Sequence, residues 1–351
     1  MADIVCIIDG MTDEEFQLKD YSQLASLTEA GISGYLATTP PGFGAGTLPC
    51  VLTLLGLEEE RIPRKGRGWL EALGLGIPVK AGDLVLRGTW TALDESGRLR
   101  GMAKGPEPAE LPRTAGLRYY SAGPDKAVLV LEGQGKALHR LVTCPPHENW
   151  GQPIDSLPVR VCPLLEEFLA ACRRPGLALL PWGESAAAEL PRPNLPLRAA
   201  AVTATPVVKG IARQLGMMVI QPPGATGDVD TDLAGKTAAA LSLCRDYPLV
   251  LLHIDGADEA AHRLLPEEKR RFLRRVDREV LKTLAGGRDR LLITADHGTS
   301  PYTGRHLREP QPFVLWGPGL KGPGQVSTLI KPIPGVEALG LFGKYSDGDE
   351  H

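Results

Sequence analysis

Two short motifs combine carboxylates with imidazoles at positions where strands are expected to end. Asp296-His297 follows the apolar run 291–293, and Asp258 and His262 follow the apolar run 249–254. Residues four apart lie on one face of a helix, so Asp258 and His262 can act on the same group. Carboxylate oxygens and imidazole nitrogens are both accepted ligands of divalent metals. Each motif alone is weak evidence, because an Asp or His in a loop is more often a cap or a surface residue.

A second pair of residues could supply a hydroxyl nucleophile and another carboxylate. Asp9 follows the apolar run 4–8, and Thr47 lies in the loop 39–50, which is rich in glycine and proline. An apolar helix is predicted just beyond this loop, so Thr47 lies near a helix amino end, where free N–H groups stabilise anions. A hydroxyl in that environment suits a nucleophile whose product is a phosphate ester. The alternatives are a capping threonine and a turn-forming aspartate.

The elements that position these residues alternate between strands and helices. Uninterrupted apolar runs predict strands buried on both faces, which is typical of a parallel sheet. In open α/β sheets, ligands bind at the carboxyl ends of the strands, which is where Asp9, Asp258 and Asp296 fall. Strands are predicted at 4–8, 33–37, 217–220, 249–256, 291–293 and 312–316, and helices at 21–30, 51–55, 205–215, 233–244 and 267–284.

The pattern changes between residues 80 and 197. Short apolar runs at 84–86, 127–131 and 177–180 alternate there with proline-rich connections. We therefore predict a smaller α+β domain over residues 80–197, inserted into a core formed by 1–79 and 198–351.

The composition excludes several classes of protein. The chain has 351 residues, a formal net charge of -3, 43% apolar residues and 23% charged residues. This charge favours neither a nucleic-acid nor a membrane partner, and no run approaches the roughly 18 apolar residues of a membrane span. The amino end lacks the basic start of a signal peptide. The six cysteines show no paired spacing, so we expect free thiols and a cytoplasmic protein.

The separate motifs are better explained by one shared site. His306 adds another imidazole in the loop before the final predicted strand. Together the carboxylates and imidazoles suffice for two divalent ions, and such a site stabilises both the entering and the leaving oxygen of a phosphoryl transfer.

With these motifs, the chain resembles the alkaline phosphatase superfamily and, within it, the archaeal-type cofactor-independent (2,3-bisphosphoglycerate-independent) phosphoglycerate mutases. The resemblance implies an alkaline-phosphatase-like α/β core, with a mainly parallel sheet flanked by helices. The inserted domain matches more loosely, through residues 82–87, and is expected to carry substrate specificity. The matching core motifs are Asp9-Gly10, Gly46-Thr47, Gly66-Arg67-Gly68, Val207-Val208-Lys209-Gly210, Pro223-Gly224-Ala225-Thr226-Gly227, Asp258-Glu259-Ala260-Ala261-His262 and Asp296-His297-Gly298-Thr299.

The resemblance also implies roles for individual residues. Two divalent ions are expected, of manganese, magnesium, zinc or cobalt, and no organic cofactor. The expected ligands of one ion are Asp9, Thr47, Asp296 and His297, and those of the other are Asp258, His262 and His306. The candidates for binding a small phosphorylated substrate are Arg67, Arg87 and Lys209.

The implied activity is metal-dependent phosphoryl transfer through a phospho-Thr47 intermediate, interconverting 3-phosphoglycerate and 2-phosphoglycerate. The family nucleophile is a serine, and here Thr47 takes its place, followed by Leu48-Pro49-Cys50 instead of polar residues. Threonine is the nucleophile in phosphodiesterase and phosphonate-hydrolase branches of the superfamily. A homoserine kinase-like phosphotransferase or a phosphohydrolase is therefore the nearer alternative, and a non-catalytic metal-binding regulatory protein is the more distant one.

Overall fold

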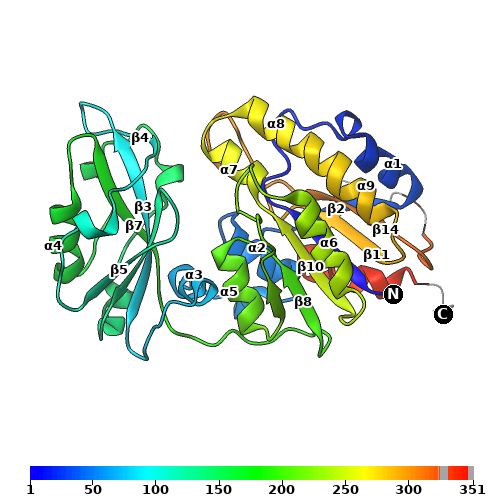
Figure 1. Ribbon diagram of the computed structural model, residues 1–351, viewed down its shortest axis with the longest axis horizontal. Helices are drawn as coiled ribbons and strands as arrows, with labels where there is room; N and C mark the ends of the chain where they lie inside the picture. The colour runs from blue at the N-terminus through cyan, green and yellow to red at the C-terminus, as the bar shows by residue number, and fades with distance from the viewer. Residues whose placement is uncertain (323, 325–330, 347–351) are drawn as a thin grey trace. The chain divides into compact units, whose positions relative to one another are not determined.

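The computed structural model describes residues 1–322, 324 and 331–346, which form two compact units (Figure 1). The larger unit comprises Met1–Ile62 and Leu190–His351, and the smaller unit comprises Pro63–Glu189. The chain therefore leaves the larger unit and later returns to it, as it does around an inserted domain. The observed divisions fall after residues 62 and 189, whereas the sequence placed them after 79 and 197.

The larger unit is built on a mixed sheet in which most strands are parallel. Its strand order in the described part of the chain is β15-β2-β14-β11-β1-β10-β8-β9. The exception is β14, which is antiparallel to both β11 and β2. This arrangement confirms the predicted α/β class with a mainly parallel sheet. The strands are β1 (Asp3–Ile8), β2 (Ile32–Ala37), β8 (Ala199–Val202), β9 (Met218–Ile220), β10 (Leu249–Ile254), β11 (Arg290–Thr294), β14 (Gln311–Trp316) and β15 (Ile333–Pro334).

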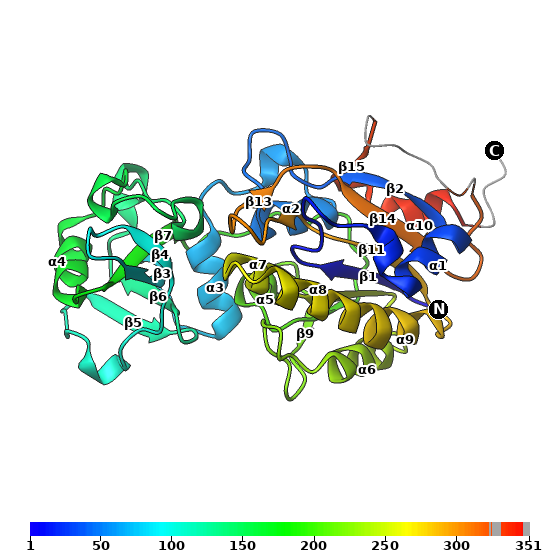
Figure 2. The ribbon, with the colours of Figure 1, turned by 90° about the horizontal axis from the view of Figure 1, so that it is seen from above.

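Helices flank this sheet on both faces (Figure 2), with α1, α6, α8 and α9 on one side and α2 on the other. The predicted helix 267–284 is present as α8 and α9, joined through a π-helical segment, Val276–Leu281. Among the described residues, no helix has the length and apolar character that a bilayer crossing requires. The helices are α1 (Ser22–Ala30), α2 (Thr47–Leu54), α5 (Pro206–Gln214), α6 (Leu233–Leu243), α7 (Gly256–His262), α8 (Pro266–Arg275), α9 (Lys282–Ala285) and α10 (Gly340–Lys344).

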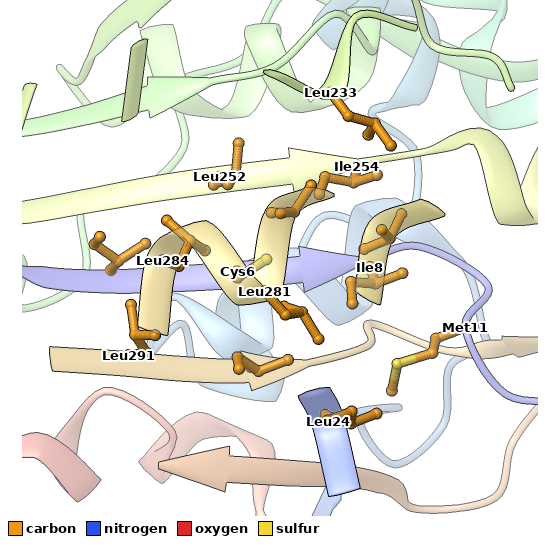
Figure 3. Packing of buried hydrophobic residues seen from close by; sticks show 14 of the residues in the cluster. Cys6, Ile8, Met11, Leu24, Leu233, Leu252, Ile254, Leu281, Leu284 and Leu291 are labelled. Carbon is orange, nitrogen blue, oxygen red and sulfur yellow. The ribbon is translucent and has the colours of Figure 1, made fainter. Parts of the chain in front are cut away.

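The core on one face of the sheet is mainly aliphatic (Figure 3). Cys6 and Ile8 of β1 pack there in one cluster with Leu252 of β10 and Leu281 of the π-helical segment. The intervening residues of β1 are buried as well, so this strand is covered on both faces, as predicted for a central parallel strand. Asp9 therefore directly follows five buried apolar residues of this strand.

The smaller unit is an antiparallel sheet covered by helix α4 (Pro163–Cys172). Its central strand β3 pairs with β4, β6 and β7, and β5 pairs with β6. Trp90 and Phe168 are buried in the cluster that joins this sheet to α4, which gives the α+β arrangement predicted for the insertion. The strands are β3 (Leu84–Leu93), β4 (Leu99–Met102), β5 (Leu117–Ser121), β6 (Lys126–Leu131) and β7 (Leu177–Ala186).

Helix α3 (Arg67–Leu75) belongs to the smaller unit, which explains why the first division comes earlier than predicted. A Cβ added to Gly68 would lie only 2.7 Å from the carbonyl oxygen of Val85 in β3. The Trp69 N–H also donates to Ser185 Oγ of β7 at 2.6 Å. Glycine at position 68 therefore lets the first turn of α3 rest directly on the sheet.

Candidate metal centre

The carboxyl ends of three neighbouring strands bring the predicted metal ligands together. β1 pairs in parallel with β10 on one side and with β11 on the other. The residues that follow these strands therefore meet at one edge of the sheet. They are Asp9 after β1, Asp255 and Asp258 after β10, and Asp296 and His297 after β11.

The first predicted set of ligands is compact and buried. His297 Nε2 lies 3.4 Å from Asp9 Oδ1 and 3.4 Å from Asp296 Oδ2. Thr47, the first residue of α2, places Oγ1 3.4 Å from Asp9 Oδ2. None of the four side chains is more than 5% exposed. The predicted position of Thr47 at a helix amino end is confirmed, although α2 begins four residues earlier than expected.

The second predicted set is equally close. His262 Nε2 lies 3.1 Å from Asp258 Oδ2, across one turn of α7. A short hairpin of β12 (Gly298–Thr299) and β13 (His306–Leu307) delivers His306, whose Nε2 lies 3.1 Å from His262 Nε2. All seven predicted ligands thus lie around one end of the central strands.

The imidazoles of the second set point their lone pairs inward. His262 Nδ1 lies 2.8 Å from the Gly304 carbonyl, and His306 Nδ1 lies 2.9 Å from the Ala45 carbonyl. A carbonyl oxygen only accepts, so each Nδ1 carries the hydrogen and each Nε2 of the neutral ring has a lone pair. Two nitrogens with lone pairs 3.1 Å apart repel each other unless a cation or a proton lies between them.

The pKa values of the carboxylates also favour a cation at this site. Burial raises the pKa of Asp9 well above its ordinary value, and neighbouring Asp296, Asp258 and Asp255 raise it further. Burial also raises the pKa of Asp296. Asp258 differs. Burial alone would raise its pKa, but the adjacent histidines lower it well below the ordinary value, and His262 has the largest lowering effect. The pocket therefore holds more negative charge than its own residues neutralise.

Unsatisfied buried atoms test whether these residues fit a metal. Four acceptor-type atoms at this site have no hydrogen-bond partner among the described residues: Asp9 Oδ1, Asp296 Oδ2, His253 Nε2 and His297 Nε2. Buried polar atoms without partners are costly, and carboxylate and imidazole atoms in this number are the ligand types of a divalent transition metal. The residues fit such an ion.

Two of the three predicted substrate-binding residues form a cluster in the smaller unit. Arg67 Nε lies 2.8 Å and Arg87 Nη1 2.5 Å from the same oxygen, Oε1 of Glu71. Both guanidinium groups also lie over the Trp182 ring, at 4.7 and 4.9 Å from its centroid. Lys209 lies on α5 of the larger unit, where its Nζ donates to Gln221 Oε1 at 2.9 Å.

Several residues of these clusters were missed by the motif analysis. His253 is fully buried inside β10, and Thr205 contacts its imidazole. Thr299, named above only as part of a motif, contacts the imidazole of His297. A histidine within an otherwise apolar strand was a usable signal, because buried polar side chains need partners. The contribution of Trp182 had no comparable signal, since a tryptophan in a strand is ordinarily a core residue.

Comparison with known proteins assigns the family. The sequence profile of the metalloenzyme superfamily matches residues 3–332. The chain is 30% identical over 375 residues to the 2,3-bisphosphoglycerate-independent phosphoglycerate mutase 1 of Methanothermobacter thermautotrophicus, covering 92% of this chain and 90% of that protein. It is also 30% identical over 372 residues to the corresponding mutase of Ignicoccus hospitalis, covering 90% and 89%. The chain therefore belongs to the metalloenzyme superfamily and, within it, to the family of 2,3-bisphosphoglycerate-independent phosphoglycerate mutases.

Solved structures show the same fold. A protein from Pyrococcus horikoshii superposes with a TM-score of 0.68 at 22% identity, covering 98% of this chain and 96% of that one. The cofactor-independent phosphoglycerate mutase of Thermoplasma acidophilum superposes with a TM-score of 0.53 at 20% identity, covering 98% and 100%. Family membership and the buried acceptor set together support the binding of divalent metal.

Proposed function

We propose that this chain interconverts 3-phosphoglycerate and 2-phosphoglycerate by metal-dependent phosphoryl transfer through phospho-Thr47. The observation that carries the proposal is the Thr47 hydroxyl at the amino end of α2, 3.4 Å from a buried carboxylate of the metal centre. The relatives named above as phosphoglycerate mutases, which match nearly the whole chain, support the choice of substrate.

The proposed centre holds two divalent ions. Asp9, Thr47, Asp296 and His297 would hold one ion, and Asp258, His262 and His306 would hold the other. Bound there, the ions would lower the pKa of the Thr47 hydroxyl and stabilise the charge on the phosphoryl group being transferred.

The proposed chemistry of the chain itself begins at Thr47. Its Oγ1 gives up its proton to solvent and attacks the phosphorus in line, the new bond joins Thr47 to the phosphoryl group, and the bond to the substrate oxygen breaks. The released glycerate oxygen takes up a proton. Backbone N–H groups in the first turn of α2 then stabilise the phosphate on Thr47. The glycerate reorients, its other hydroxyl attacks phospho-Thr47 and loses its proton, and the threonine hydroxyl is regenerated.

We assign substrate positioning to the smaller unit. Glu71 accepts from both Arg67 and Arg87, so the two guanidinium groups are held close together in the smaller unit. Guanidinium groups bind carboxylate and phosphate through paired hydrogen bonds. We propose that these two arginines bind the anionic groups of the small phosphorylated substrate, with Lys209 as a further candidate on the larger unit.

The decisive experiment is incubation with 3-phosphoglycerate and manganese, coupled to enolase, with intact-mass detection of a phosphate adduct. The expected result is formation of 2-phosphoglycerate together with a phosphorylated protein. Thr47→Ala should abolish both signals, with a rate loss on the order of 10⁴-fold or more, as for other covalent nucleophiles. Thr47→Ser should retain activity because it keeps the hydroxyl.

Other outcomes would point to the alternatives. Release of inorganic phosphate without 2-phosphoglycerate would indicate a phosphohydrolase. Phosphorylation of homoserine by ATP would indicate the related kinase. Metal binding with no adduct from any phosphomonoester would indicate a non-catalytic protein.

A further inference from the structure

His253 contacts the metal centre from inside the sheet. It is fully buried in β10, and its Nε2 lies 3.2 Å from Asp9 Oδ2. Its Nδ1, on the other side of the ring, lies 3.3 Å from Thr205 Oγ1. One ring nitrogen therefore faces the predicted metal ligands, and the other faces a single hydroxyl.

The hydroxyl of Thr205 determines which nitrogen of His253 carries the hydrogen. Thr205 Oγ1 lies 2.7 Å from Asp255 Oδ2, which is closer than its 3.3 Å distance to His253. A hydroxyl has one hydrogen, and the shorter bond to the carboxylate takes it. Thr205 Oγ1 therefore accepts from His253 Nδ1–H, and Nε2 of the neutral ring keeps its lone pair. Nε2 and Asp9 Oδ2 are then two buried acceptors 3.2 Å apart, an arrangement that needs a cation or a proton between them.

His297 has the same arrangement of partners. Thr299 Oγ1 lies 2.5 Å from Asp258 Oδ1 and 3.3 Å from His297 Nδ1. In each case an aspartate contacts a threonine, and the threonine contacts Nδ1 of a histidine. The Nε2 of both histidines faces the carboxylate of Asp9. A hydrogen bond to Nδ1 that fixes the ring and its tautomer is the usual support of a metal-bound histidine.

The spacing also fits a shared ion. Ligand atoms about 2.1 Å from one ion lie roughly 3 to 3.5 Å from each other when they occupy adjacent positions around it. The distance from His253 Nε2 to Asp9 is 3.2 Å, and both distances of His297 Nε2, to Asp9 and to Asp296, are 3.4 Å. Ligand atoms of Asp9, His253 and Asp296 all lie within 4.8 Å of one another.

We propose that His253 is a further ligand of the ion held by Asp9 and Asp296, and that Thr205 and Asp255 are positioning residues for its ring. This inference rests on the metal centre of the proposed function. Lys236 of α6, fully buried, interacts electrostatically with Asp255 and provides a counter-charge behind the Asp255–Thr205–His253 series.

The first test counts metal-bound imidazoles in the unmodified protein. The zinc-loaded protein, labelled with ¹⁵N-histidine, should show four rings with a metal-bound Nε2 and a protonated Nδ1 in long-range proton–nitrogen correlation spectra. These rings would be His253, His262, His297 and His306. Three such rings, with His253 unbound, would overturn the inference.

The second test removes the Thr205 hydroxyl that holds the His253 ring and leaves the ring itself in place. Thr205→Val has nearly the same shape but no hydroxyl, so the affinity of one of two Mn²⁺ ions should fall by about 10- to 100-fold in calorimetric titration. Thr205→Ser should restore it. Thr237→Val is the matched control, because Thr237 is also buried and its hydroxyl donates to the Leu233 carbonyl of its own helix. Unchanged Mn²⁺ affinity in a folded Thr205→Val protein would also overturn the inference.

Failure of the inference can be distinguished from failure of the proposed function. If the protein binds two ions and interconverts phosphoglycerates with only three bound imidazoles, the role of His253 alone is wrong. If the protein binds no divalent ion, the role of His253 and the proposed function fail together.

Discussion

The metal centre of the larger unit and the arginine cluster of the smaller unit differ in how their buried charges are balanced. In the metal centre, carboxylates and imidazoles face one another, and several acceptor atoms have no partner among the described residues. In the arginine cluster, Glu71 accepts from both Arg67 and Arg87, and Trp182 lies beneath the two guanidinium groups. The first cluster is incomplete without a cation, whereas the second is largely neutralised by its own residues.

This difference indicates what each cluster contributes. A pocket with excess acceptors gains its stability only when metal binds, so its geometry and its affinity for metal are coupled. A cluster that is already paired is held in place before any ligand arrives. The predictions below test whether the two clusters are separable in this way.

The largest effect is expected from His297→Ala. Removing a ligand should weaken binding of the ion held with Asp9 by more than about 100-fold, the upper range seen when only a supporting residue is lost, and mutase activity should fall with it. Metal analysis after dialysis and the enolase-coupled assay measure the two quantities. His139→Ala, which removes an exposed histidine of the smaller unit, should change neither. Normal metal content in His297→Ala would contradict the ligand assignment.

A smaller effect, on stability, is expected from Glu71→Gln. The Glu71 side chain is only 2% exposed and pairs with two arginines, so removing its charge should destabilise the smaller unit by about 3 kcal/mol. Four of the five tryptophans, at positions 69, 90, 150 and 182, lie in this unit. Urea unfolding followed by tryptophan fluorescence therefore reports on it. Glu107→Gln, at an exposed ion pair with Lys104, should change stability by less than about 0.5 kcal/mol.

The pH dependence of the stability difference between wild type and Glu71→Gln shows whether the arginines stabilise the charged form of Glu71. Burial alone would raise the pKa of Glu71, but Arg87 and Arg67 lower it below the ordinary value of 4.5. The folded state therefore binds this proton less readily than the unfolded state. The contribution of Glu71 should be complete above pH 4.5 and should be lost as the pH falls below it. A stability difference between wild type and Glu71→Gln that persists unchanged into acid would contradict this account.

The smallest effect is expected from Trp182→Leu. Losing the aromatic face beneath two guanidinium groups should cost about 1 kcal/mol of substrate binding, seen as a several-fold rise in KM for phosphoglycerate. Metal content should not change, because Trp182 is not part of the metal centre. Trp182→Phe keeps the ring and loses the hydrogen bond to Thr89 Oγ1, so its KM should lie between the two. Equal KM values for all three proteins would show that the stacking does not position the arginines.

Much of the metal centre could be predicted from local sequence. The run 4–8 is apolar throughout and predicted a buried strand with Asp9 at its end, and β1 confirms this. Asp258 and His262 share a helix face because of their four-residue spacing, and the expected contact is present at 3.1 Å. The six cysteines are also unpaired, as their spacing indicated.

The tertiary structure decided what depends on contacts between distant parts of the chain. The placement of β1 between β10 and β11 brings three strand ends together, and no local pattern specifies which strands become neighbours. The same pairing turns His253, a polar residue in an apolar run, toward Asp9. Helix α3 lies with the smaller unit because Gly68 has no side chain to keep it from β3. The sequence by itself determined which residues could do chemistry, and strand pairing and close packing decided which of them meet.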